Sequence, residues 1–318
     1  MRLFTVWVFL AWKNVLDHLA RVAGAIRRLG DRLSGSLLRH VDFRLWLGVR
    51  RRLHAAWPLS RRARNRRAVA AANRHSLLGE EDSRPVDFAW LMQRRRLLDL
   101  AAVYAHNGPL LEQLARCSAR LNRVVEPLHR AGVPVILAPM HTVSDVLAAL
   151  VGADVYPGRA TVIVSGDVQQ HFQRAPAHGW RQRLDCCSIH DDQRRLAGKL
   201  AQAVLEAADH RRNIILFPDI TPDYTLHGNS GPTAKLACRL FHRPAQLHSG
   251  IVRLSRALRA QMVCYSLYYD RGIHIRIDEP VAAENIRLAL PGLVEQAMVR
   301  HADDWLLWHS HSLFFINE

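Results

Sequence analysis

Cysteine is scarce in this chain, and its spacing excludes several kinds of site. The five cysteines form no C-x-x-C pair and no Cys/His cluster with zinc-ligand spacing: Cys117, Cys186, Cys187, Cys238 and Cys264. An odd number without a regular framework argues against a disulfide-stapled secreted domain and favours reduced thiols in a cytoplasmic setting. The adjacent Cys186 and Cys187 are expected to be buried at a strand end, in preference to a redox-active pair.

Acidic residues are nearly absent from the first 78 residues. Three aspartates face 17 basic side chains there, so this part carries +14 of the net charge of +16. The remainder of the 318-residue chain is almost neutral, at +2. We therefore expect a basic region over residues 1–78 and a domain over residues 79–318 that is long enough to bury a substantial core.

The N-terminus also lacks an apolar run long enough to cross a bilayer. Residues 1–12 are apolar apart from Arg2 and Thr5, but a spanning helix needs about 20 such residues. No small-residue cleavage site follows, so a removable signal is not expected. Instead, apolar residues continue at steps of three and four: Phe4, Val8, Trp12, Val15, Leu19, Val22 and Ile26. This stripe, beside arginines, predicts an amphipathic helix lying on a membrane surface; the alternative is a helix packed on the domain.

Arginine runs follow this stripe, at residues 50–52 and 61–67. Next to an amphipathic helix, such runs are expected to meet anionic lipid head groups. Nucleic acid is not expected as a partner, because the runs have no interleaved aromatics and the chain shows no zinc finger or RNP signature.

From about residue 85, helical and strand patterns alternate. Helices are expected at 86–105, 109–131, 142–152, 192–209, 233–242 and 249–259, and strands at 133–138, 160–165, 213–217, 262–269 and 272–277, with a short apolar stretch near 184–189. This order predicts an α/β fold with a largely parallel central sheet that is flanked by helices.

The leading candidate for chemistry lies where the first strand runs into a helix. His141 and Asp145 occupy that junction, at the carboxyl end of a strand, where α/β proteins place ligands. If the helix already includes His141, Asp145 lies one turn later on the same face and can bond the imidazole. A carboxylate on one ring nitrogen leaves the other to accept a proton. The alternative is an ordinary i, i+4 pair at a helix start.

Ser144 lies three residues after this histidine but has no G-x-S-x-G surroundings, so a nucleophilic serine is not expected. The segment 228–233 is glycine-rich but lacks the P-loop lysine, and a helix cap is the preferred reading.

Three further segments, read with His141 and Asp145, resemble the lipid A biosynthesis acyltransferases, the late lauroyl/myristoyl-transferase family. They are the strand 214–219 (Ile-Ile-Leu-Phe-Pro-Asp), the stretch from Phe241-His-Arg-Pro-Ala to Cys264, and Trp305-Leu-Leu-Trp308-His309. Together they span roughly residues 85–312 in the family's order. Two departures stand out: this chain has three residues between histidine and carboxylate instead of four, and His242 replaces the glycine usual after the aromatic.

The resemblance implies transfer of a fatty acyl group from a thioester, such as that on acyl carrier protein, to a hydroxyl of a lipid A-like or other lysolipid. His141 would be the general base and Asp145 its orienting partner. Backbone amides near Thr142 would stabilise the oxyanion. No metal, nucleotide or other cofactor is required. The supporting or substrate-binding candidates are Thr142, Ser144, Arg181, Arg183, Asp219, Arg243 and Arg253.

This interpretation places the protein at the cytoplasmic face of the inner membrane, with anionic lipid and an acyl donor as partners. Two alternatives stay open: a catalytically inert relative that binds lipid or a carrier protein, and an acyltransferase acting on a specialised metabolite. The shortened histidine–carboxylate spacing is the feature that keeps the inert alternative open.

Overall fold

The computed structural model describes residues 33–56, 61–79, 86–164, 183–188, 193–220 and 235–310, together with residues 12, 13, 15, 18 and 30. Most of the N-terminal apolar stripe, Arg181 and the glycine-rich segment 228–233 lie outside the described residues.

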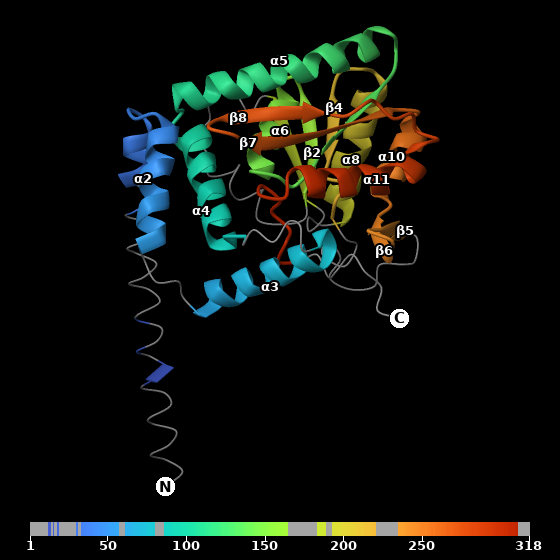
Figure 1. Cartoon of the computed structure of the whole chain (residues 1–318). Coiled ribbons are helices and arrows are strands. Elements are labelled where there is room, and N and C mark those ends of the chain that lie inside the picture. The colour runs from blue at the N-terminus through green and yellow to red at the C-terminus, as the bar shows by residue number, and fades with distance from the viewer. Residues whose placement is uncertain are drawn as a thin grey trace.

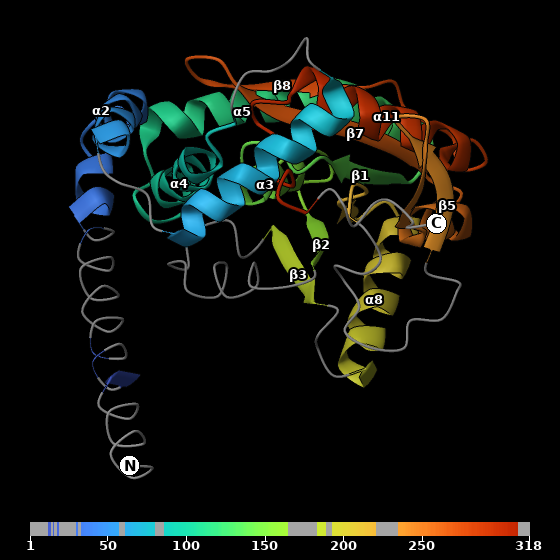
Figure 2. The same ribbon diagram turned by 60° about the horizontal axis from the view of Figure 1, so that its bottom comes forward.

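A six-stranded sheet forms the centre of the molecule (Figures 1 and 2). Its strands lie in the order β3 (Leu184–Ser188), β2 (Ala160–Val164), β4 (Asn213–Leu216), β1 (Val135–Pro139), β7 (Gln261–Tyr269) and β8 (Ile273–Ile277). All neighbours are parallel except the β7–β8 pair. Every residue of β1 is buried, as expected for a strand covered on both faces. The predicted α/β class and largely parallel sheet are confirmed.

Helices cover both faces of this sheet. Alternate residues of each strand point to opposite faces, so each strand contributes apolar side chains to two separate cores. On one face, Val135 and Leu137 of β1 share a core with α5 (Gly108–Arg130), α6 (Asp145–Ala153) and the π-helical turn η2 (Leu100–Tyr104). On the other, Ile136 and Ala138 share a core with α8 (Gln193–Ala208), α10 (Gly250–Leu258) and α11 (Ile286–Arg300). The helix α4 (Phe88–Asp99) contributes to both cores.

The helix expected at 233–242 is wrong. Residues 235–248 form an antiparallel hairpin of β5 (Lys235–Leu240) and β6 (Arg243–His248). In β5, Leu236 and Leu240 are buried and Cys238 is half-buried, whereas the residues between them are exposed. In β6, Ala245 and Leu247 are buried, so the period is two residues, the period of a strand. The alternation of buried and exposed residues in this segment favours a strand over the expected helix.

The hairpin turns at Phe241 and His242, which have φ of 50° and 62°. A two-residue hairpin loop with positive φ at both positions is the type I′ geometry, in which glycine is favoured. Histidine occupies the second of these positions, so this chain adopts the left-handed conformation there at a cost.

We therefore expect His242→Gly to stabilise the protein by about 1 kcal/mol, because glycine adopts this conformation without steric conflict. Its urea unfolding midpoint should rise. His242→Ala is the matched control, since it removes the same exposed ring but keeps the Cβ, and it should give no gain. Equal midpoints for the two variants would contradict the assignment of strain to this φ.

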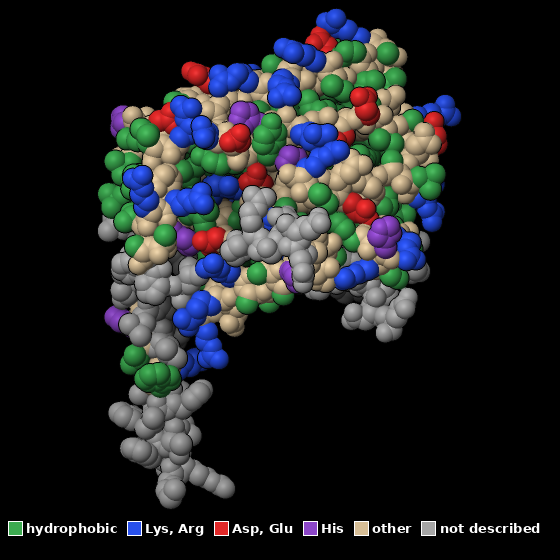
Figure 3. Space-filling view, viewed as in Figure 1, with side chains coloured by type: hydrophobic (Ala, Val, Ile, Leu, Met, Phe, Trp, Pro, Cys, Tyr) green, Lys and Arg blue, Asp and Glu red, His purple; other side chains and the backbone are tan. Residues whose placement is uncertain are grey.

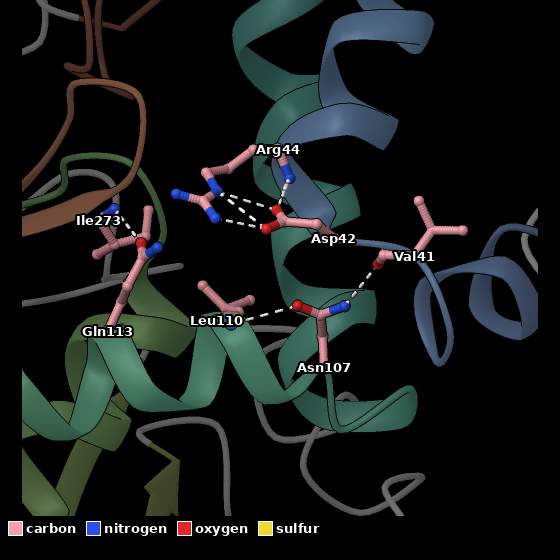
Figure 4. A network of polar contacts seen from close by, with 7 residues as sticks. All are labelled: Val41, Asp42, Arg44, Asn107, Leu110, Gln113 and Ile273. Carbon is pink, nitrogen blue, oxygen red and sulfur yellow. Dashed lines mark hydrogen bonds and ion pairs between the residues drawn. The ribbon is translucent and has the colours of Figure 1, made fainter.

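The described part of the basic region packs on the domain. The helix α2 (Phe43–Ala56) buries Phe43 and Leu47 in the core that α5 shares. Asn107, just before α5, donates from Nδ2 to the carbonyl of Leu38 at 2.6 Å. It also donates to the carbonyl of Val41 at 2.9 Å and accepts from the amide of Leu110 (Figure 4). This asparagine therefore fastens the start of α2 to the start of α5.

The next helix, α3 (Arg61–Leu78), also contacts the domain. Its Arg74 is buried and pairs with Asp303 at 2.7 Å, and Asn73 donates to the carbonyl of Trp308 at 2.7 Å. Among the described residues, no helix is long and apolar enough to cross a membrane. The predicted boundary after residue 78 stays a prediction, although the residues described before it share cores with those after it.

Candidate active site

His141 and Asp219 meet at the carboxyl edge of the sheet. His141 follows β1 and Asp219 follows β4, and these two strands are parallel neighbours. The imidazole Nδ1 lies 2.7 Å from Asp219 Oδ1, and the backbone N–H of His141 donates to Asp219 Oδ2, also at 2.7 Å. Both carboxylate oxygens are thus committed to a single residue, which fixes the histidine in place.

This geometry assigns the imidazole tautomer. A carboxylate can only accept hydrogen bonds, so Nδ1 carries the proton and Nε2 keeps its lone pair. The His141 side chain is 13% exposed, whereas that of Asp219 is fully buried. The ring also packs against Phe217, with 4.4 Å between ring centroids. The site therefore presents a fixed, oriented base whose partner is shielded from water.

The predicted bond between His141 and Asp145 is not formed, so that prediction is wrong. The helix α6 begins at Asp145, with Ser144 as its N-cap, so His141 lies outside the helix and the i, i+4 relation does not apply. Asp145 instead lies 2.5 Å from Nη2 of Arg95 on α4. Its carboxylate is occupied by an arginine, and Asp219 takes the role that the sequence suggested for Asp145.

The loop between His141 and α6 is strained. Val143 has a φ of 56°, which is unusual for any residue except glycine and an outlier for a β-branched one. Strain of this kind costs about 1–3 kcal/mol and persists only where surrounding contacts enforce it. Here the amide of Val143 donates to the carbonyl of Asp304 at 3.0 Å.

The same contacts rule out the expected oxyanion donors. The amides of Thr142 and Ser144 donate to the carbonyls of Met140 and Thr142, at 2.8 and 2.6 Å. With Val143 also engaged, none of these three amides is available to a substrate oxygen. The expectation of an oxyanion hole at Thr142 is therefore wrong for these amides. Thr142 Oγ1 is buried and has no hydrogen-bond partner among the described residues.

A C-terminal segment, residues 301–306, clamps this loop. Thr142 forms a β-bridge with Trp305, and the amide of Leu306 donates to the carbonyl of His141 at 2.9 Å. Asp304 is itself held, because its side chain pairs with Arg94 of α4 and accepts from the amide of Tyr269 at 2.8 Å. This segment, which carries Trp305, thus positions the histidine loop.

Arg94, Asp99 and Asp304 were missed as site residues. Asp99, at the end of α4, accepts a hydrogen bond from the hydroxyl of Ser144. That hydroxyl also accepts from the amide of Leu147 at 3.1 Å, so Ser144 is a helix cap that ties α6 to α4. No local pattern could have identified these side chains, because the contacts that place them at the site span 35 to 210 positions of the chain.

The arginines nominated from the sequence do not meet at the dyad. Arg183 precedes β3, at the amino edge of the sheet, and is paired with Asp154 at 2.5 Å. Arg243 lies on the hairpin and donates to the hydroxyl and carbonyl of Ser76, both at 3.0 Å. Arg253 is exposed on α10. Arg181 lies outside the described residues.

The cysteines are not poised for chemistry. All five are free. Burial raises the pKa of Cys186 to about 12 and that of Cys117 to about 11. Burial likewise raises the pKa of Cys264, and the nearby carboxylates of Asp278 and Asp219 raise it further. Within the described ranges, no three His, Cys, Asp or Glu side chains gather as metal ligands would.

Comparison with known proteins leaves the site to be interpreted from its geometry, since no model of a protein family and no curated protein matches the chain.

Proposed function

We propose that the protein is a membrane-associated acyltransferase that moves a fatty acyl group from an acyl thioester to a hydroxyl of a lipid A-like or other lysolipid acceptor. The observation that carries the proposal is the contact between His141 Nδ1 and Asp219 Oδ1 at 2.7 Å. It leaves Nε2 as a base at the carboxyl edge of a parallel sheet, where α/β folds bind their ligands.

The reaction begins when Nε2 of His141 takes the proton from the acceptor hydroxyl. The oxygen then attacks the thioester carbonyl, and the carbon–sulfur bond breaks. The imidazolium returns the proton to the thiolate leaving group. Asp219 stabilises the imidazolium through Nδ1–H and holds its orientation, as the aspartate of a catalytic triad does. No nucleophilic serine is needed, since the acceptor supplies the attacking oxygen.

The inert alternative would be favoured by a histidine with no carboxylate partner. Asp145 is indeed unavailable, since it pairs with Arg95, but Asp219 supplies that carboxylate. Lipid mass spectrometry of cells with and without the protein tests the proposal. A lipid that gains one acyl chain only when the protein is present supports it and identifies the acceptor. Identical lipid profiles, with no acylated soluble product, would favour the inert alternative.

Membrane association has its own support on α2. Leu45, Val49 and Leu53 recur every four residues along one helix face, and they are 68, 45 and 55% exposed. Arg51 and Arg52 lie beside them and are exposed as well. An apolar stripe flanked by arginines suits the interface of an anionic membrane. We infer that this face, together with the N-terminal stripe, docks on the inner membrane.

Leu45→Ser combined with Leu53→Ser should weaken binding to vesicles that contain phosphatidylglycerol by about tenfold or more, because two apolar side chains no longer enter the bilayer. Cosedimentation measures the effect. Leu288→Ser is the matched control, since Leu288 is 84% exposed but lies on α11. An equal loss for the control, or none for the double variant, would contradict docking through α2.

A further inference from the structure

A pocket of about 580 Å³ lies around the edge strand β8 and is lined largely by cationic and aromatic side chains. Three of them are arginines from three different elements: Arg120 of α5, Arg276 of β8 and Arg300 of α11. Figure 3 shows Lys and Arg side chains close to histidine in the middle of the face that carries β7, β8 and α11. None of these three arginines belongs to the His141 site.

The positive charge of this pocket is only partly neutralised. Asp278 lies 3.8 Å from Nε of Arg276 and 3.9 Å from Nη1 of Arg300, which is beyond hydrogen-bond distance. Arg120 makes no ion pair with any residue that the structure describes. Three guanidinium groups against one carboxylate leave a charge of about +2, which matches a phosphomonoester dianion near neutral pH.

Two stacked aromatic rings, Tyr268 and His301, line the pocket, with 5.4 Å between ring centroids and nearly parallel planes. Tyr268 also stacks on His274, with 5.2 Å between ring centroids. His301 is 9% exposed, and its Nε2 has no hydrogen-bond partner among the described residues. A buried polar nitrogen without a partner is destabilising, and a ligand oxygen in this pocket would offer it an acceptor. The unpaired His301 nitrogen and the excess arginine charge therefore indicate the same kind of ligand.

We propose that this pocket binds a phosphoryl group, either on a soluble phosphomonoester or on a lipid head group. Arginine is the side chain best suited to this recognition, because its planar fork donates two parallel hydrogen bonds to phosphate oxygens. Three guanidinium groups match the several acceptor oxygens of a phosphomonoester better than the two of a carboxylate. Ile275 and Ile277 supply an apolar lining for the carbon part of the ligand.

The pocket adjoins the segment that positions His141. His301 lines the pocket, and its carbonyl accepts from the amide of Asp304 at 2.9 Å. The carbonyl of Asp304 in turn accepts from Val143 in the strained loop. A ligand in this pocket therefore contacts the same short segment, residues 301–306, that clamps the histidine loop. The proposal does not depend on acyl transfer, because binding alone tests it.

Isothermal titration of the full chain with two probes separates the two sources of the phosphoryl group. Glycerol 3-phosphate represents a soluble phosphomonoester, and monomeric dihexanoyl phosphatidic acid represents a lipid head group. Arg276→Gln and Arg300→Gln should each weaken binding about tenfold or more. Arg120→Gln, on a different element, should do the same. Arg287→Gln is the matched control, since Arg287 is exposed on α11 outside the pocket.

Pocket-dependent binding of glycerol 3-phosphate supports a soluble ligand, and pocket-dependent binding of the short-chain lipid alone supports a lipid head group. If neither probe binds at millimolar concentration, the proposal is overturned. It is equally overturned if Arg287→Gln weakens binding as much as the pocket variants, because that result indicates general charge attraction. Circular dichroism of each variant confirms that the exposed substitutions leave the fold intact.

Discussion

His141→Ala should lower acyl transfer by about two to four orders of magnitude, the usual contribution of a general base. Without the ring, no group on the described loop is placed to take the proton from the acceptor hydroxyl. The thioester and the acceptor still bind, so the loss should fall on kcat with little change in KM. Single-turnover transfer of a radiolabelled acyl chain measures this directly.

The fold should survive this substitution. The His141 ring contacts only Phe217 and Asp219 among the interactions described, and its backbone bonds remain. His75→Ala is a suitable control, because it removes an exposed histidine on α3 far along the chain from the dyad. Transfer that persists in His141→Ala at a near wild-type rate would overturn the assignment of this base.

Asp219→Asn and Asp145→Asn should separate catalysis from stability. Asp219→Asn should reduce kcat by about two orders of magnitude or more, since an amide no longer stabilises the imidazolium and favours the wrong tautomer. Asp145→Asn keeps the His141–Asp219 pair. It weakens one ion pair of Arg95, which also lies 3.9 Å from Asp99, and should lower the free energy of unfolding by up to about 3 kcal/mol, because the pair with Asp145 is largely buried.

The two variants are matched, because each replaces one buried aspartate near the same loop with its isosteric amide. Activity is compared by single-turnover transfer and stability by urea unfolding. If Asp145→Asn lost activity at unchanged stability while Asp219→Asn kept it, the dyad described here would be wrong. The carboxylate suggested by sequence spacing would then be the functional one.

Much of the fold could be predicted from local patterns. The apolar run of β1 and the alternation of strands with helices indicated a parallel sheet, and that sheet is observed. The hairpin β5–β6 differs from the prediction. A helix was expected at 233–242, whereas Leu236, Cys238 and Leu240 alternate with a period of two residues, which is the period of a strand. That error is instructive, because Phe241 and His242 carry no glycine or asparagine to announce the turn.

The candidate site was predicted less completely. His141 and Asp219 were both nominated because each ends a strand, but the bond between them was not foreseen. Adjacent pairing of β1 with β4 was the signal that could have revealed it, since neighbouring parallel strands bring their carboxyl ends together. The i, i+4 spacing of Asp145 was the stronger local pattern, and it pointed to a different partner.

The sequence by itself determined most of the elements, the arginine-rich N-terminal charge and the strand-end position of the histidine. These follow from periodicity and composition, which are properties of neighbouring residues. Only the tertiary structure decided which carboxylate orients His141. That choice depends on the pairing of two strands whose end residues, His141 and Asp219, are 78 positions apart. It also depends on the N-cap Ser144, because α6 begins only at Asp145 and leaves His141 outside the helix. The tertiary structure also decided that residues 301–306 clamp the loop, since contacts between distant segments exist only once the sheet and its helices have assembled.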